Sequence, residues 1–179
     1  MSTATSERRD WVPAAPFRAH VHRLMRQSGV PWPVVAFLAG TPLATVRTLV
    51  IGRGGKLRPR VHRHAAQQLI RLRENDLRRT RLDQVPAEPT GERIRLLRAR
   101  GVSWAAIAQH LQLTQTTCQE IAQGRRTSCS VMVEILSSTA CELAGILPWE
   151  DPTYAVSSTS TKTRSSTSFG KVRGSIGSI

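Results

Sequence analysis

The sequence predicts an all-α fold with two small helix-turn-helix domains, and three observations support this. Residues 23–53 align without a gap to residues 95–125, and ten of the 31 aligned pairs are identical. Each copy spaces its apolar residues at helical intervals and separates them with glycines. No segment shows the apolar–polar alternation of a half-buried strand. We therefore expect one helical motif in two copies.

The first unit, residues 16–84, is expected to follow a flexible arm, residues 1–15, in which prolines interrupt a polar start. Apolar residues at i, i+4, i+7 and i+8 from Phe17 form one face of a first helix. Glycines end this helix, form the next turn and end the third helix, because glycine adopts left-handed conformations without a steric penalty. The expected helices are 17–28, 32–39 and 42–51, then a long helix from Pro59 to about Leu82.

A short, stiff linker rich in proline, residues 85–89, is expected to lead to the second unit, residues 90–150. Hydroxyl side chains that can cap a first helical turn precede each of its first three helices. These are Thr90, Ser103 and Thr114. A last helix is expected over about 129–146. The tail, residues 151–179, is rich in Ser, Thr and Gly and has too few large apolar residues to offset ordering entropy, so we expect it to be disordered.

Within each unit, the spacing fits two helices that cross steeply over a short turn. A small residue has to stand where the helices cross, and Ala36 and Ala108 occupy that place. Gly40 suits a turn with positive φ, whereas Gln112 departs from the pattern at the equivalent position. The residues expected to face the core are Val35, Ala39, Val46 and Leu49 in the first unit, and Ile107, Leu111, Cys118 and Ile121 in the second.

The second helix of each motif is the expected recognition helix, whose N-terminal residues reach base edges in the major groove. Arginine can bridge guanine, glutamine can bridge adenine, and small apolar groups can contact thymine methyls. The expected base-reading residues are Pro42, Leu43, Ala44, Arg47 and Thr48, and Thr114, Gln115, Thr116 and Gln119, with Glu120 beside them. Basic residues after each recognition helix are expected to bind phosphates, which sets register and affinity but carries no sequence information. They are Arg53, Lys56, Arg58, Arg60, Arg63, Arg125 and Arg126.

Charge favours a polyanionic partner and divides the chain unevenly. The formal net charge is +14 and the pI about 11.6. Residues 16–84 carry 14 Lys and Arg against three acids, whereas residues 85–152 carry six Arg against seven acids. The first unit therefore holds the electrostatic signal for double-stranded DNA. We expect no membrane contact and a cytoplasmic, nucleoid-associated protein, because no run of about 18 apolar residues and no secretory leader is present.

We expect neither enzymatic activity nor a cofactor or metal. The sequence has no glycine-rich phosphate loop and no convincing carboxylate pair. The pairs His20/His22 and His62/His64 are two residues apart, so on a helix they point away from one another. The three cysteines lack a C-x-x-C spacing, and Tyr154, the only tyrosine, lies in the tail, which excludes a tyrosine recombinase.

The segment TGERIRLLRARGVSWAAIAQHL, residues 90–111, and the paired glycines resemble helix-turn-helix regulators of the phage-repressor (Cro-like) class. More narrowly, the chain resembles tandem helix-turn-helix proteins of actinobacteria and their phages. The resemblance covers about residues 17–147. It implies a sequence-specific repressor of transcription, with control of phage immunity and lysogeny as one such role.

Three hypotheses for the function remain open. Two different recognition helices on one chain can read an asymmetric site as a monomer. Alternatively, the first unit binds DNA while residues 90–150 bind protein, as a homodimer surface or a contact to the transcription machinery. The near-neutral charge of that unit favours this, and its polar reading residues oppose it. The third reading is an architectural or excisionase-like accessory factor, which the charge favours but which has no need of two ordered recognition helices.

Overall fold

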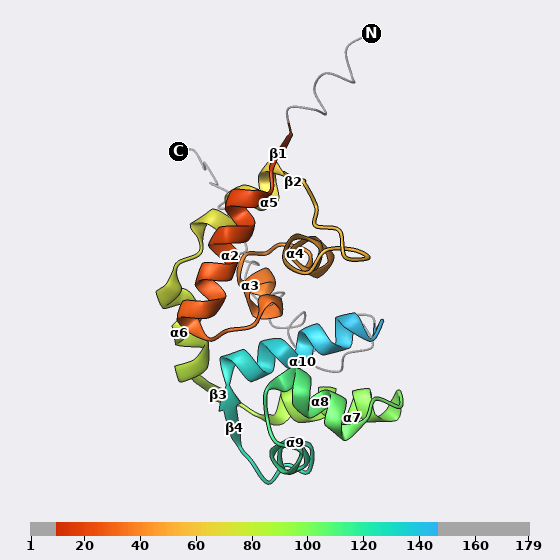
Figure 1. Ribbon diagram of the computed structural model, residues 1–179. Coiled ribbons are helices and arrows are strands. Elements are labelled where there is room, and N and C mark those ends of the chain that lie inside the picture. The colour runs from red at the N-terminus through yellow and green to blue at the C-terminus, as the bar shows by residue number, and fades with distance from the viewer. Residues whose placement is uncertain (1–9, 147–179) are drawn as a thin grey trace, which may run out of the picture.

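The computed structural model describes residues 10–146, and this part of the chain is mostly helical (Figure 1). The predicted all-α fold is therefore confirmed. The expected flexible arm, apart from residues 10–15, and the expected disordered tail lie outside the described residues. Among residues 10–146 no helix is long and apolar enough to cross a membrane.

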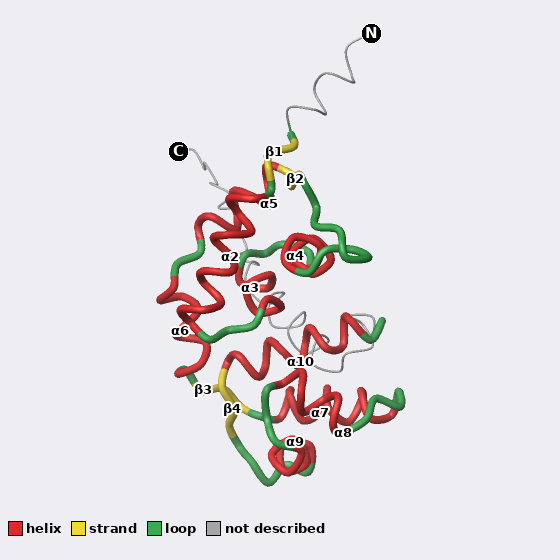
Figure 2. Tube along the Cα trace, viewed as in Figure 1, coloured by secondary structure: helices red, strands yellow, loops and turns green. Residues whose placement is uncertain are grey.

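The internal repeat is also a repeat of structure, since both copies contain a strand, three helices, a second strand and a further helix (Figure 2). The first repeat, residues 11–71, contains β1 (Trp11–Pro13), α2 (Ala15–Ser28), α3 (Trp32–Leu38), α4 (Leu43–Val50), β2 (Arg60–His62) and α5 (Arg63–Arg71). The second repeat, residues 84–143, contains β3 (Gln84–Pro86), α7 (Glu88–Ala99), α8 (Trp104–Leu111), α9 (Gln115–Ala122), β4 (Ser128–Ser130) and α10 (Val131–Leu143). The connecting helix is α6 (Glu74–Leu82).

A short antiparallel ribbon closes each repeat, which the sequence analysis did not predict. β1 pairs with β2 and β3 pairs with β4. Just after the first strand of each ribbon, a backbone hydrogen bond of 2.9 Å joins it to the other side of the repeat. The amide of Ala14 donates to the carbonyl of Pro59, and the amide of Ala87 donates to the carbonyl of Thr127. The expected linker, residues 85–89, is thus strand β3 and the first turn of α7. Three-residue strands are too short for alternation to show, and their partners lie far away in the sequence.

The single long helix expected over residues 59–82 is also wrong, because β2, α5 and α6 occupy this stretch. The chain is extended at Leu72 and Arg73, with ψ of 136° and 154°. The carboxylate of Asp76 accepts a hydrogen bond from the amide of Arg73 at 3.0 Å, which begins α6 anew. Local capping by an aspartate competes with continuation of a helix, and here it ends α5.

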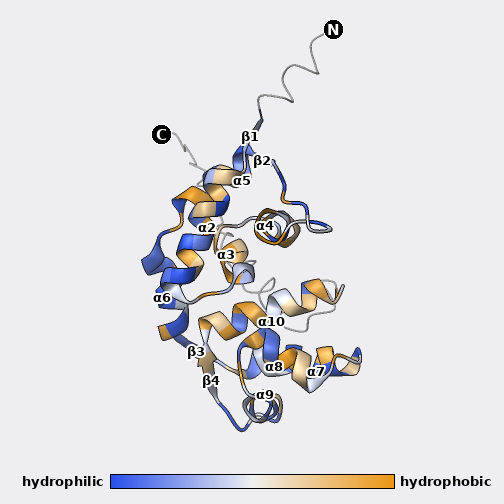
Figure 3. Ribbon diagram, in the orientation of Figure 1, coloured by the Kyte–Doolittle hydropathy of each residue, from blue (hydrophilic) through white to orange (hydrophobic). Residues whose placement is uncertain are grey.

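Helix α10 brings the two repeats together (Figure 3). It packs against α7 and α8 of its own repeat and against α3 and α6 on the other side. A helix that is apolar around most of its circumference is typical of a buried position. Its buried residues are Met132, Val133, Ile135, Leu136, Ser137, Thr139 and Cys141. The repeats therefore share one hydrophobic core instead of forming two separate ones.

In the first helix of each repeat, the structural equivalence differs by one residue from the gap-free alignment. Leu24 and Leu97 are both buried, whereas Leu96, which the alignment pairs with Leu24, is only half-buried. Four residues separate Leu24 from Gly29, but only three separate Leu97 from Gly101. The offset is thus 73 residues in the first helix and 72 from the glycine onward. Buried positions, and not identical residues, therefore show which residues of the two first helices are equivalent, because burial depends on the side of the helix on which a residue lies.

Gln112 keeps the backbone conformation of the glycine that it replaces. Gly40 has φ of 59° and Gln112 has φ of 56°, the only positive φ of a non-glycine residue among those described. A side chain in this left-handed region approaches the following carbonyl oxygen, which costs about 1–2 kcal/mol. The turn of the second motif is therefore strained, yet it has the same shape as the first.

We predict that Gln112→Gly stabilises the protein by about 1 kcal/mol, because relief of strain exceeds the extra entropy of glycine in the unfolded chain. Thermal unfolding should then shift upward by about 2–4 °C. The matched substitution Gly40→Gln should lower the melting temperature. An unchanged or lower melting temperature for Gln112→Gly would show that the turn carries no such strain.

A second prediction concerns pH. His110 of α8 lies against α10, where burial lowers the pKa of its imidazole and a hydrogen bond to the carbonyl of Leu136 opposes this shift. The unfolded chain therefore takes up a proton at higher pH than the folded chain, and stability falls as pH decreases below about 6.5. Unfolding in urea between pH 7.5 and pH 5 should show this loss, and His110→Gln should reduce it. Equal slopes for both proteins would exclude His110 as the cause.

Candidate nucleic-acid interface

The predicted helix-turn-helix scaffold forms in both repeats. Helix α3 packs against α4 and helix α8 against α9, and Ala36 and Ala108 are both buried. The eight residues expected to face the core are buried as well. They are Val35, Ala39, Val46, Leu49, Ile107, Leu111, Cys118 and Ile121. Burial of one face of α4 and α9 determines which side chains of these helices remain outside.

In the second repeat, the N-terminal turn of α9 is capped and its outer side chains are exposed. The hydroxyl of Thr114 accepts a hydrogen bond from the amide of Thr117 at 3.1 Å, as expected of a helix cap. Gln115 and Thr116 are exposed in the following turn, and Gln119 is half-buried one turn later. In Figure 1, α9 lies at the end of the molecule opposite to β1 and β2. The predicted reading residues of this helix thus form a polar outer face.

In the first repeat, the prediction for Leu43 is wrong. Its side chain is only 4% exposed and belongs to the core, so it is not free to contact a thymine methyl. Pro42, Ala44 and Arg47 are exposed, and Thr48 is half-buried. Leu43 aligns with the exposed Gln115, so the alignment gives no indication that one side chain is buried and the other exposed. The packing around each helix decides the exposure of these two side chains.

Three of the remaining predicted base-reading residues of α4 line an open cleft. This cleft, of about 550 Å³, is lined by Ala44, Arg47 and Thr48 on α4 and by Arg53 just beyond it. The C-terminal turn of α10 supplies Glu142 and Leu143 on the other side. A carboxylate and an apolar side chain therefore stand opposite the face of α4 that was expected to read bases.

Six of the seven predicted phosphate-binding residues are exposed, and Arg58 is half-buried. Exposed cations follow α4 at Arg53, Lys56, Arg60 and Arg63, and follow α9 at Arg125 and Arg126. Three of the seven, Arg58, Arg63 and Arg126, have partners on the protein. The guanidinium of Arg58 lies 5.0 Å from the ring centroid of Trp11. Arg126 forms an ion pair with Glu120 at 2.8 Å.

No acidic residue occurs in the sequence between Asp10 and Glu74. The surface of α4, β2 and α5 is therefore basic without a carboxylate of its own. Fixed positive charge that is not neutralised nearby attracts polyanions and releases their counterions on binding.

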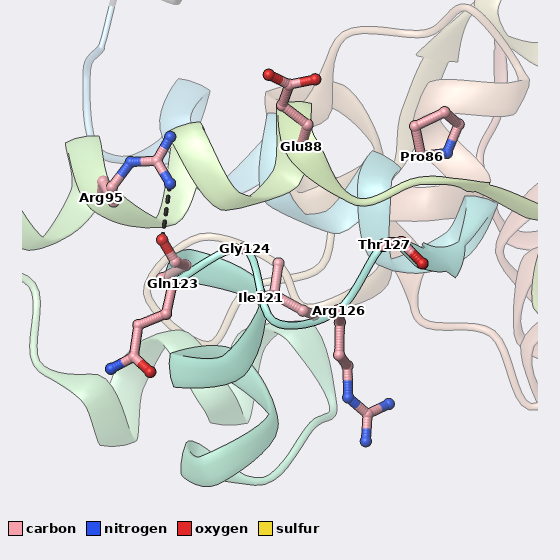
Figure 4. Close-up of a pocket in the computed structure, with 9 residues that line it drawn as sticks. Pro86, Glu88, Arg95, Ile121, Gln123, Gly124, Arg126 and Thr127 are labelled. Atoms are coloured by element: carbon pink, nitrogen blue, oxygen red, sulfur yellow. Dashed lines mark hydrogen bonds between the residues drawn. The ribbon is translucent and has the colours of Figure 1, made fainter.

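Two arginines that were not among the predicted site residues contact the C-terminal ends of α4 and α9. The guanidinium of Arg18 on α2 donates a hydrogen bond of 2.8 Å to the carbonyl of Leu49, near the end of α4. The guanidinium of Arg95 on α7 donates a hydrogen bond of 2.7 Å to the carbonyl of Ala122, at the end of α9 (Figure 4). The last carbonyls of a helix lack intrahelical donors, and a cation near them also interacts favourably with the helix dipole. Arg18 and Arg95 therefore help to fix the orientation of α4 and α9, and Arg95 does so from an exposed position.

Figure 4 shows a cleft of about 440 Å³ beside this contact, between the start of α7 and the end of α9. Here α7 approaches α9 so closely that a Cβ on Gly91 would lie 2.7 Å from the carbonyl oxygen of Ile121. With the offset of 73 residues, Gly91 occupies the place of Arg18. In the first repeat an arginine side chain therefore lies between the two helices at this position, whereas in the second repeat the backbones of α7 and α9 approach each other directly.

The described residues offer no cluster of three or more His, Cys, Asp or Glu that could hold a metal ion. Cys118, Cys129 and Cys141 are buried. Burial raises the pKa of the Cys118 and Cys129 thiols, which favours their neutral form. Their surroundings are those of packing residues.

Comparisons of the chain with protein families, with curated proteins and with solved structures each found no match.

We predict that Gly91→Ala destabilises the protein by about 1–3 kcal/mol, as overpacking does, although alanine is the better helix former. The helix propensity of alanine predicts an increase in stability, whereas the close approach of α9 predicts a decrease. The sign of the change in melting temperature distinguishes the two effects. A higher melting temperature for Gly91→Ala would mean that α7 and α9 can separate at no cost.

Proposed function

We propose that this protein is a sequence-specific double-stranded DNA-binding regulator, most simply a repressor, that reads bases chiefly with α9. The observation that carries the proposal is the exposed, polar N-terminal turn of α9 on a buried helix-turn-helix scaffold. In this motif the same turn of the second helix meets base edges in the major groove.

The chemistry of that turn suits base recognition. The amide of Gln115 can accept from and donate to the edge of adenine, and the methyl and hydroxyl of Thr116 can meet thymine or a polar edge. The cap at Thr114 and the contact from Arg95 fix both ends of α9. A helix held at both ends loses little further entropy when it binds, which favours discrimination between bases.

The first repeat supplies charge to the same proposal. Its exposed cations after α4, among them Lys56 and Arg60, lie in a stretch of chain that has no carboxylate of its own, and this excess of positive charge favours contact with phosphates. Such contacts give affinity and register but no sequence preference. This division of labour reconciles the net charge of +11 in residues 16–84 with the near-neutral second half.

Helix α4 is the weaker candidate for base reading in this arrangement. A major groove is about 12 Å wide and a helix about 10–12 Å across, so DNA strands must pass on both sides of an inserted helix. Glu142 and Leu143 stand across the cleft from α4, where one strand would have to pass. Reading by Arg47 therefore requires the C-terminal turn of α10 to move aside.

The charge difference between the halves also favours a second candidate, in which the first repeat binds DNA and residues 90–150 bind protein. The two candidates predict different roles for α9. Under the second, its outer face contacts another subunit or the transcription machinery, and its substitution leaves DNA sequence preference unchanged.

The test is a selection from random-sequence DNA at about 150 mM salt, where non-specific charge binding is weakened. The full chain should recover a consensus. On that site, Gln115→Ala should weaken binding by about 5- to 150-fold and relax one position, while non-specific binding is unchanged. Gln123→Ala is the matched control, because Gln123 is exposed just after the last turn of α9, and it should bind like the wild type.

Recovery of a consensus that Gln115→Ala leaves intact, and that Arg47→Ala relaxes, would assign base reading to α4 and overturn the role given to α9. Failure to recover any consensus would contradict the proposed function and favour a sequence-tolerant architectural protein.

A further inference from the structure

The connection that follows the recognition helix is four residues longer in the first repeat than in the second. It begins at equivalent glycines, Gly52 and Gly124, and ends at Pro59 and Thr127, whose carbonyls accept the equivalent bonds from Ala14 and Ala87. Six residues lie between these points in the first repeat and two in the second. The extra residues are thus an insertion into an otherwise shared framework.

The inserted residues form a tight hairpin, residues 53–56. The amide of Arg53 donates to the carbonyl of Lys56 at 3.0 Å, and the amide of Lys56 donates back at 3.1 Å. Gly54 and Gly55 have φ of +57° and +75°. Positive φ at both central residues is the geometry of the tightest hairpin turns, whose twist matches that of paired strands.

The base of this hairpin is closely packed against its own backbone. Gly52 has φ of +87°, and a Cβ there would lie 2.7 Å from the carbonyl oxygen of Lys56. At the tip, by contrast, a Cβ on Gly54 or Gly55 would meet nothing within 4 Å. The segment between α4 and β2 extends beyond α4 (Figure 2), and Arg53 and Gly54 line the cleft that Glu142 of α10 also lines. The hairpin is therefore anchored at its base and has a bare backbone at its tip.

The shape and charge of the hairpin fit one element of duplex DNA. A tip without side chains is slim, and the flanking Arg53 and Lys56 are exposed. A minor groove about 6 Å wide excludes a helix of about 10–12 Å but admits extended chain and basic side chains. Narrow A·T-rich minor grooves also concentrate negative potential, which attracts inserted arginine and lysine.

We infer that the 53–56 hairpin enters the minor groove beside the site read by α9 and adds a preference for A·T-rich flanking sequence. The inference rests on the proposed function, because it takes double-stranded DNA as the ligand. It goes further in assigning a second, groove-specific contact to a segment that the second repeat lacks. The readout is of groove width and potential, so no base-specific hydrogen bond is required.

The experiment compares duplexes that share the selected core site and differ only in flanks made of A·T, G·C or inosine·cytosine pairs. Inosine lacks the amino group that guanine places in the minor groove but keeps the major-groove edge of guanine. The wild-type chain should bind A·T and inosine·cytosine flanks alike, and about fivefold more tightly than G·C flanks, near the low end of a single base-pair effect.

The paired variant Arg53→Gln/Lys56→Gln keeps both glycines and the backbone bonds of the turn, so it tests the side chains without removing the hairpin. It should bind all three duplexes equally. A control with the same loss of charge is Arg26→Gln/Arg71→Gln, at exposed residues of α2 and α5. This control should keep the ratio between flanks, whatever its affinity for the three duplexes.

A uniform loss of affinity with an unchanged flank ratio in Arg53→Gln/Lys56→Gln would make the hairpin a phosphate contact only and overturn the inference. So would inosine·cytosine flanks that behave like G·C, because the preference would then come from the major groove. Gln115→Ala, measured on the same duplexes, separates the two proposals: if it weakens binding to the core site while flanks have no effect, the proposed function stands and the hairpin inference fails.

Discussion

The close crossing of the two motif helices is the contact on which the rest of the structure depends. Ala36 and Ala108 are buried residues of the first motif helix in each repeat, and a close-packed core resists a larger side chain at a buried alanine. Once the crossing is set, one face of α4 and α9 is buried and the opposite face is fixed. The arginines that contact the C-terminal end of each recognition helix and the ribbons that close each repeat add to this constraint. The outer face thus follows from packing at its back.

Helix α10 gives the duplicated motif a different outcome in each copy. Because it is buried between α3 and α6 on one side and α7 and α8 on the other, it forces the repeats into one body. Its C-terminal turn then reaches the cleft beside α4, whereas α9 packs against α7 and α8 of its own repeat. Two copies of one sequence pattern therefore present unequal surfaces.

The two copies have also diverged in chemistry. The first keeps the basic residues and an inserted hairpin with a glycine tip, and the second keeps a polar outer turn on its recognition helix. The second also tolerates a left-handed Gln112 and a bare backbone contact at Gly91. Under the proposed function these differences are complementary, since one copy supplies electrostatic attraction and the other supplies base discrimination.

The sequence by itself determined the helical class, the duplicated motif and the core-facing residues, because helix periodicity and glycine turns are local properties of the chain. It did not predict the ribbons, whose strands are three residues long, nor the break at Leu72 and Arg73. Only the tertiary structure decided that Leu43 is buried while Gln115 is exposed, and that Glu142 and Arg47 line the same cleft. Exposure depends on contacts between residues distant in the chain, and the pattern of one helix carries no information about what packs against it.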